Sequence, residues 1–285
     1  HMHCESFFFT KKLLGIDNII KNKANDYEIN FDYINIPGGE FWQGTYEGEN
    51  NISFDNELPQ FKTYVNNFTV SKYCVTEKMV VHFINSNGYS NKNYWSDNGW
   101  RYIKNNKINL PFYWISQNND FLINDNGKLR SPKSNLPVTH ITWYEAEAIC
   151  SFLGGRLPTE SEWEYLSTNG GTTKYPWGNG MNIKMNLNYS GSICEVDKFP
   201  KANNKNGVSQ LIGNVWEWCQ EPIYPYDGFC IDPVYREFSY PFFGFKKILR
   251  GGSWAVSHIL INSRYRNAQM PDCRIQFTGF RVVKN

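Results

Sequence analysis

The second half of the chain consists of short apolar pieces separated by glycine, proline and asparagine. Residues 207–285 contain GNVWEW, LRGGSW, RYRN and GFRVV in that order. From residue 175 onward this pattern predicts a loop-rich region with few long regular elements. Such a region buries a core only when large side chains fill the space between loops. The sequence supplies 10 Trp, 18 Tyr and 20 Phe, which suit either a core of this kind or a concave binding site.

Length, charge and hydropathy narrow the class of protein. With 285 residues, of which 41% are hydrophobic, we expect one large irregular domain. The formal net charge of +2 is too small to indicate a surface that follows a phosphate backbone, so no nucleic-acid partner is expected. No window approaches 18 apolar residues, which predicts a soluble protein without a membrane span.

The seven cysteines are scattered and show no CxxC spacing. Their odd number and wide separation favour reduced thiols in a cytoplasmic protein, with disulfides in an oxidising compartment as the open alternative. We interpret the leading His1 and Met2 as an expression remnant, which leaves open a longer natural protein with a signal or a further domain.

The first half carries clearer signals of regular structure. We expect a strand and tight turn at INIPGGEFWQG and two strands within FDNELPQFKTYVNNFTVSKYCV. Thr76 is a suitable N-cap for a helix in EKMVVHFINSNG. Capping boxes at Thr142 with Glu145 and at Thr159 with Glu162 predict two further helices. Residues 1–30 are predicted to be a leader or an arm that packs on the body, and residues 31–285 the domain itself.

Residues 34–283 carry an ordered series of motifs that resembles one enzyme family. IPGGEFWQGT, FTVSKYCVTE, PVTHITWYEAEAICSFLGGRLPTESEWEY, LIGNVWEW, RGGSWAV and GFRVV are similar to the formylglycine-generating-enzyme, or sulfatase-modifying-factor, family. The resemblance implies an α+β, loop-rich variant of the C-type-lectin fold. FDNELP, YWSDNGW and YREFSYPFFG bring the chain closest to the C-terminal domain of ergothioneine and ovothiol sulfoxide synthases. Those enzymes oxidatively couple a thiol to a histidine derivative at a nonheme iron.

The metal ligands of both enzyme types are missing from the expected places. Formylglycine generation needs a copper-binding cysteine pair, but Val256 stands near the first position and Ile261 or Asn262 near the second. We therefore expect neither that activity nor copper. The three iron-binding histidines of sulfoxide synthases come from a DinB-like helical bundle, and the histidines here show no ligand spacing. Iron is expected only with a partner domain of that kind.

The resemblance does assign substrate contacts to this chain. Tyr235 lies where the sulfoxide synthases carry a catalytic phenol, although a packing role is equally open. Phe238 stands nearby without the hydroxyl that some relatives have. Asn267 matches the amide that binds the histidine-derived substrate, and Ala268 and Gln269 replace an aromatic and an acidic residue.

Two further assignments concern charge. Arg264 and Arg266 are candidates for holding a substrate carboxylate, with a structural ion pair as the alternative for one of them. The resemblance also implies a possible calcium site, for which the chain offers oxygen ligands at Gln210, Gly213, Val215 and Glu217.

Several motif residues are expected to serve the scaffold. Trp216 and Trp218 alternate with Glu217, which predicts a half-buried strand whose tryptophans face the core. Gly251 and Gly252 indicate a turn or a close backbone approach. Arg156 is expected to pair with a carboxylate at a helix start.

The sequence leaves three functions open, and whether the chain is an enzyme stays undecided. It is either the substrate-binding half of an oxygen-dependent oxidoreductase, or a non-catalytic module that binds a ligand, protein or peptide. The second function predicts an open aromatic surface around residues 256–276. A third is new chemistry at clustered thiols such as Cys219, Cys230 and Cys273.

Overall fold

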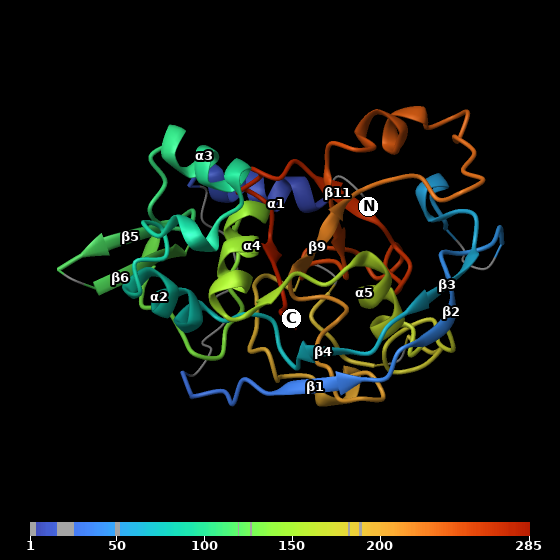
Figure 1. Cartoon of the computed structure of the whole chain (residues 1–285), viewed down its shortest axis with the longest axis horizontal. Helices are drawn as coiled ribbons and strands as arrows, with labels where there is room; N and C mark the ends of the chain where they lie inside the picture. The colour runs from blue at the N-terminus through green and yellow to red at the C-terminus, as the bar shows by residue number, and fades with distance from the viewer. Residues whose placement is uncertain are drawn as a thin grey trace.

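Short helices and strands joined by long loops make up the computed structural model (Figure 1). It describes residues 4–15, 26–48, 52–118, 120–125, 127–181, 183–187 and 190–285; His3 lies outside them. The α-helices are α1 (Cys4–Leu13), α2 (Glu77–Asn85), α3 (Asp97–Asn105), α4 (Trp143–Phe152) and α5 (Glu160–Ser167). The 3-10 turns are η1 (Asp55–Glu57), η2 (Lys92–Tyr94), η3 (Pro200–Ala202), η4 (Arg236–Phe238) and η5 (Tyr240–Phe242).

Two four-stranded sheets organise the body. The first has the order β1-β4-β13-β8, formed by β1 (Tyr33–Ile36), β4 (Phe68–Ser71), β13 (Val283–Lys284) and β8 (Gly155–Arg156). The second has the order β11-β10-β9-β12, formed by β11 (Asn267–Gln269), β10 (Lys247–Arg250), β9 (Trp216–Pro222) and β12 (Thr278–Gly279). Since β13 pairs with both β4 and β8, the C-terminal end of the domain closes against its beginning.

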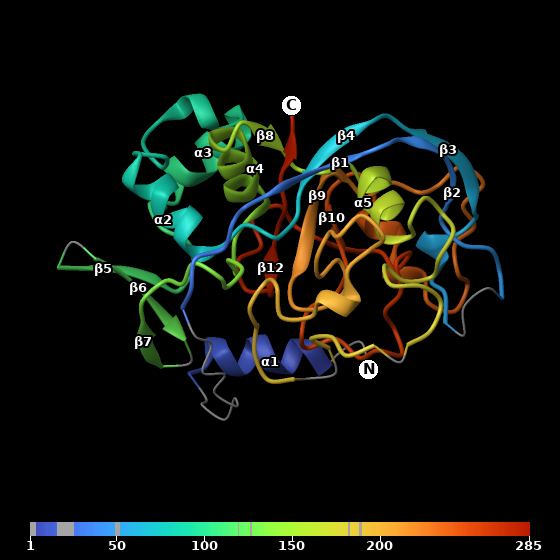
Figure 2. The ribbon, with the colours of Figure 1, turned by 90° about the horizontal axis from the view of Figure 1, so that it is seen from below.

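Two hairpin systems extend from these sheets. Strands β2 (Gly39–Gln43) and β3 (Phe61–Val65) pair antiparallel. Strands β5 (Trp114–Gln117), β6 (Asp120–Asp125) and β7 (Lys128–Arg130) form a three-stranded sheet that projects beside α2 and α3 (Figures 1 and 2). The sequence analysis did not predict this sheet, whose short strands are mostly polar, or α3, although α3 is amphipathic and has Ser96 as its N-cap.

The local helix signals are confirmed. Both predicted capping boxes form, with the hydroxyls of Thr142 and Thr159 accepting from the backbone N–H of Glu145 and Glu162. Thr76 occupies the N-cap of α2 in extended conformation, but its side chain makes no capping hydrogen bond. Arg156 donates to both carboxylate oxygens of Glu162 at 2.6 and 2.8 Å, as expected for a residue that holds a helix start.

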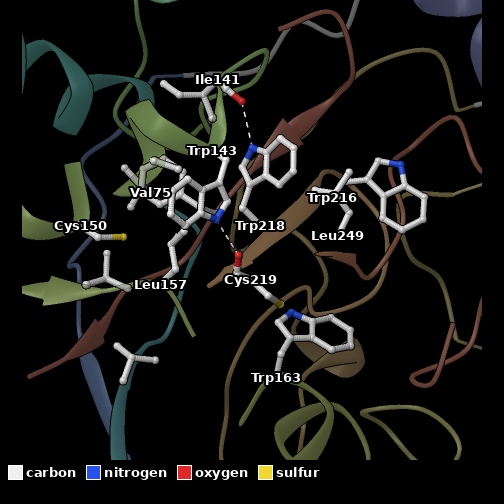
Figure 3. Packing of buried hydrophobic residues seen from close by; sticks show 14 of the residues in the cluster. Val75, Ile141, Trp143, Cys150, Leu157, Trp163, Trp216, Trp218, Cys219 and Leu249 are labelled. Atoms are coloured by element: carbon white, nitrogen blue, oxygen red, sulfur yellow. Dashed lines mark hydrogen bonds between the residues drawn. The ribbon is translucent and has the colours of Figure 1, made fainter. Parts of the chain in front are cut away.

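Strand β9 runs through the centre of the core, which confirms the prediction that its tryptophans face the core; the prediction that the strand is only half buried is wrong. Trp216, Glu217 and Trp218 are all at most 1% exposed. Figure 3 shows the indole of Trp218 donating to the carbonyl of Ile141 at 3.0 Å, while Trp143 donates to that of Cys219 at 2.8 Å. Both faces of β9 are therefore packed, and the tryptophan N–H groups are satisfied inside the core.

Glu217 tolerates complete burial because Arg281 neutralises it. Arg281 Nε and Nη2 donate to its two carboxylate oxygens at 2.5 and 2.6 Å, and Trp163 Nε1 donates at 2.9 Å. Arg281 also donates to the carbonyls of Ser71 and Ser209. This pair ties β9, α5 and β4 to the C-terminal segment, and removing one partner would strand a buried charge.

The N-terminal arm packs on the body as helix α1, which lies along the lower edge of the molecule in Figure 2. Phe8 and Phe9 contact a small apolar cluster that contains Trp254 and Phe277. On the outer side, α1 and the turn that follows it leave apolar side chains uncovered: Phe7 is 70% exposed, and Leu14, one residue past the helix, is 68% exposed. No helix in the described ranges is long and apolar enough to cross a bilayer.

Gly251 is required by a close backbone approach, as the sequence predicted. Its φ is +89°, and a Cβ there would lie 2.4 Å from the carbonyl oxygen of Leu211. We expect Gly251→Ala to lower the free energy of unfolding by about 3 kcal/mol, from left-handed strain plus the clash. Gly154→Ala is the matched control, since Gly154 has φ +76° and open space around it. Urea unfolding checks this, and an equal loss in both variants would contradict it.

Candidate functional site

Two adjoining cavities form what we call the candidate site. The larger, of about 340 Å³, lies between the η4–η5 segment and β11, and its lining includes Tyr235, Phe238 and Lys246. The smaller, of about 150 Å³, lies between α1 and β9 and is lined by Glu5, Trp216 and Tyr265 among others. Phe238, Asn267 and Gln269 line both cavities, so the two spaces share one wall.

Most of the residues assigned from sequence meet here. Tyr235, Phe238, Asn267, Gln269 and Arg266 all line the larger cavity, although they come from segments about 30 residues apart. Arg264 is 4% exposed and lies outside the lining of both cavities as the described residues define them. Its predicted contact with substrate therefore has no support in this geometry.

Strand β11 holds the polar wall of the site. Asn267 is in register with Leu249, and Gln269 with Lys247, so both amides lie on one edge of the second sheet. Asn267 Oδ1 accepts the backbone N–H of Ala268 at 2.8 Å. Its NH2 group makes no hydrogen bond within the described residues, which leaves a donor for a ligand.

The opposite wall is held in place by Asp55 of η1. Its carboxylate accepts the hydroxyl of Ser239 and, at 3.2 Å, the backbone N–H of Asp232. The carboxylate of Asp232 in turn accepts the backbone N–H groups of Val234 and Tyr235 at 2.7 and 3.2 Å. These bonds fix a segment with little regular structure beside the cavity.

A row of aromatic rings runs from solvent to the core. Tyr235, 39% exposed, stacks on Phe238 with ring centroids 5.5 Å apart, and Phe238 stacks on Phe54 at 4.3 Å. Phe54 contacts Tyr265 at 5.6 Å, and Tyr265 contacts Trp216 at 5.8 Å. Tyr235 thus has a packing role, because its ring stacks on Phe238, and it also lines the larger cavity.

Arg266 is a structural residue at this wall. Its Nε and Nη2 donate to the carboxylate of Glu160 at 2.7 and 2.9 Å. Nη1 donates to the carbonyl of Asn56, and Nη2 also reaches that of Tyr224 at 3.0 Å. The guanidinium is 1% exposed and fully engaged, so the expected substrate-binding role is replaced by the ion-pair alternative.

Beneath the cavity, three carboxyl groups face two guanidinium groups. Arg250 donates to Glu164 at 2.6 Å and to Glu160 at 3.1 Å, while Arg266 donates to Glu160. Glu57 is fully buried, and no guanidinium within the described residues forms an ion pair with it; its Oε1 accepts the backbone N–H of Phe54 at 3.3 Å. Burial raises the pKa of Glu57 to about 8.

Glu5 brings a carboxylate from the arm into the smaller cavity. Trp216 Nε1 donates to it at 2.9 and 3.1 Å, Ser253 Oγ at 2.5 Å and Gln276 Nε2 at 3.5 Å. Burial raises the pKa of Glu5, and these hydrogen bonds partly offset that rise. Sequence reasoning missed this residue, because nothing in the arm signals a contact with a residue 211 positions away.

The predicted calcium ligands are engaged otherwise. Both carboxylate oxygens of Glu217 accept from Arg281, and the side-chain oxygen of Gln210 accepts from Asn214 at 2.6 Å. A hard cation needs several such oxygens free to converge, so Gln210, Gly213, Val215 and Glu217 do not fit calcium in this arrangement. Within the described ranges no three His, Cys, Asp or Glu side chains are placed to hold a metal.

The thiols show no activation. All seven cysteines are unbridged. Burial raises the pKa of Cys219 and of Cys273, which disfavours the thiolate that a nucleophile or metal ligand requires, and Cys230 is exposed. The burial of these thiols and the direction of their pKa shifts therefore give the hypothesis of clustered reactive thiols no support.

Comparison with known proteins identifies the family of the chain. Residues 21–285 match the sulfatase-modifying factor enzyme 1-like domain. The chain belongs to the FGE-sulfatase family. Hercynine oxygenase from Mycolicibacterium smegmatis is 32% identical over 260 residues, which cover 87% of this chain and 60% of that protein. The FGE-sulfatase chain thus spans less than two thirds of that relative.

Solved structures confirm the α+β fold of the family. PvdO from Pseudomonas aeruginosa superposes with a TM-score of 0.62 at 18% identity, covering 93% of this chain and all of that one. Treponema denticola variable protein 1 gives a TM-score of 0.60 at 19% identity, with coverage of 93% and 99%. At this identity the likeness concerns the fold alone. In this FGE-sulfatase chain, Val256 and Ile261 are buried core residues.

The raised pKa of Glu57 makes stability depend on pH. The folded form keeps its proton up to about pH 8, whereas the unfolded carboxyl has a pKa near 4.5. The stabilisation is therefore complete below pH 4.5 and is lost as pH rises toward 8. We expect wild type to lose up to about 1 kcal/mol per pH unit in this window relative to Glu57→Gln. Urea unfolding at several pH values measures this, and parallel profiles would contradict it.

Proposed function

We propose that this chain is the substrate-binding half of a nonheme-iron sulfoxide synthase, which couples a thiol oxidatively to a histidine derivative. The observation that carries the proposal is the convergence of Tyr235, Phe238, Asn267 and Gln269 on one cavity of about 340 Å³. The hercynine oxygenase relatives add support, since that name denotes an oxygenase acting on hercynine. A cavity of this size suits a small polar ligand.

The side chains divide the work in this proposal. Asn267 binds the histidine-derived ligand through its amide, and Gln269 extends the neutral polar wall. The phenol of Tyr235 stacks on Phe238 with a partly exposed ring, which suits a group that donates a proton at its hydroxyl oxygen. Burial beside the aromatic row excludes water from one side of the ligand.

The iron belongs to a second component in this proposal, because the described residues do not offer a ligand set. It would supply the oxygen chemistry from a DinB-like helical bundle on a separate chain or on a further part of this protein. The outer side of α1 and of the turn after it suits a helical neighbour, since Phe7 and Leu13 of the helix and Leu14 of the turn are 70%, 45% and 68% exposed. The opposite face of the same helix carries Glu5, which lines the smaller cavity, so a neighbour on the outer side would be separated from the candidate site by α1 itself.

A non-catalytic binding module is the second candidate. It predicts an open aromatic surface around residues 256–276, but residues 260–266 are all buried, and Tyr265 is only 5% exposed. The fold shared with Treponema denticola variable protein 1 is compatible with a binding module but does not favour it over an enzyme. We also infer a cytoplasmic protein, because seven unbridged cysteines suit a reducing compartment.

Ligand binding by the chain tests the assignment of the site. We expect calorimetric titration with the trimethylated betaine of histidine to show saturable binding, weakened about tenfold in Asn267→Ala by loss of one well-placed hydrogen bond. Asn93→Ala is the control, since Asn93 is exposed and lies on η2, outside the lining of both cavities. Equal affinity in the two variants would contradict the assignment.

Oxygen consumption tests the chemistry. After anaerobic loading with Fe(II), we expect the chain alone to show no uptake dependent on thiol and histidine betaine. A separately supplied iron-binding helical domain should restore uptake, and Tyr235→Phe should alter the rate or the product without changing betaine affinity. Substrate-dependent uptake by the chain alone would refute the need for a partner, and betaine binding without uptake in any mixture would favour the binding module.

A further inference from the structure

The charged side chains that line the larger cavity are Glu237, Lys246 and Arg266. The two cations, Lys246 and Arg266, differ in which other groups they contact. Arg266 is occupied by Glu160 and two backbone carbonyls, as described above. A ligand anion that entered the cavity would have to break a buried ion pair to use it, which is strongly unfavourable.

Lys246 is the other cation in this lining, and it is not occupied in that way. Its ammonium lies 3.4 Å from the ring centroid of Phe242, which also lines the cavity. No carboxylate forms an ion pair with it in the part of the chain that the structure describes. Burial lowers the pKa of Lys246, so its charge is under-compensated, and an arriving anion would stabilise it.

The side chains of Lys246 and its neighbour Lys247 lie in different surroundings. Lys246 immediately precedes β10, and side chains alternate along an extended chain. Lys247 places its ammonium 3.6 Å from the ring centroid of Trp143 and donates to the carbonyl of Gln220 at 2.9 Å. Lys247 does not belong to the lining of either cavity of the candidate site as described.

The register of β10 and β11 gives the direction of the ligand. Asn267 is opposite Leu249 and Gln269 opposite Lys247, so Lys246 lies toward the Gln269 end of the wall. Lys246 is three residues, roughly 10 Å along the strand, from the position opposite Asn267. Because Lys246, Gln269 and Asn267 all line the larger cavity, a ligand whose ring contacts Asn267 reaches Lys246 when its carboxylate extends past Gln269.

We propose that Lys246 recognises the carboxylate of the ligand in the larger cavity and so restricts the site to carboxylate-bearing ligands. This inference rests on the proposed function. The carboxylate belongs either to the histidine derivative or to the thiol, and matched ligand pairs separate these sources. L-Histidine and histamine differ only in the carboxylate, as do L-cysteine and cysteamine.

The test is titration calorimetry of the four compounds with wild type, Lys246→Met, Lys246→Arg and the control Lys247→Met. We expect Lys246→Met to weaken one acid about tenfold, the loss of one charge-assisted contact. The matched amine should bind Lys246→Met with the affinity it has for wild type. Lys246→Arg should bind the acid with the wild-type affinity. Lys247→Met should change the affinity of neither compound. The pair that responds identifies the source of the carboxylate.

Three results would overturn the inference. Equal weakening of an acid and its amine would assign Lys246 a structural role, and unchanged binding of the acids would show that it makes no contact. Wild type that binds neither acid would also refute it. If Asn267→Ala weakens binding of the acids and Lys246→Met does not, the recognition role fails while the proposed function stands.

Discussion

The candidate site depends on the ion pairs between α5 and the second sheet. Glu160 and Glu164 extend from the first turns of α5 and hold Arg250 of β10 and Arg266, the residue directly before β11. These groups are at most 7% exposed, so their charges interact in a medium where an unpaired charge is costly. The pairs fix β11, and β11 carries the two amides that we assign to ligand binding.

This arrangement explains how a loop-rich chain presents an ordered cavity. The floor is a buried charge cluster, one wall is a strand edge, and the other is a short segment clamped by Asp55 through hydrogen bonds. Between the walls, stacked aromatic rings from Tyr235 to Trp216 replace the regular elements that would line such a site in other folds. Few of these parts depend on a long helix or strand.

Much of the fold could be predicted because its signals are local or carried by family motifs. The capping boxes of α4 and α5 need only residues three apart, and Gly251 marks its own close approach. The errors involve distant partners. Nothing near Glu217 in sequence announces Arg281, 64 residues away, so full burial of β9 was missed.

The site shows the same division. The family motifs predicted that Tyr235, Asn267 and Gln269 share one site, and all three line the larger cavity. Each of these residues could be assigned from the short motif that contains it. They did not distinguish Arg266 as a structural residue, since Glu160 lies 106 residues earlier. Glu5 and Lys246 carried no motif, and only the packed structure places them at the cavities. The charge that a site offers to a ligand depends on which of its ionised side chains already form ion pairs within the protein. Those pairs are set by the fold.

The central claim is that the cavity between the η4–η5 segment and β11 is where this chain binds its ligand. A crystal structure of the protein with the betaine of histidine tests it most directly. The account predicts ligand density in that cavity, with the imidazole in hydrogen-bond distance of Asn267. Density at any other place on the protein, or in the cavity without contact to Asn267, would contradict it.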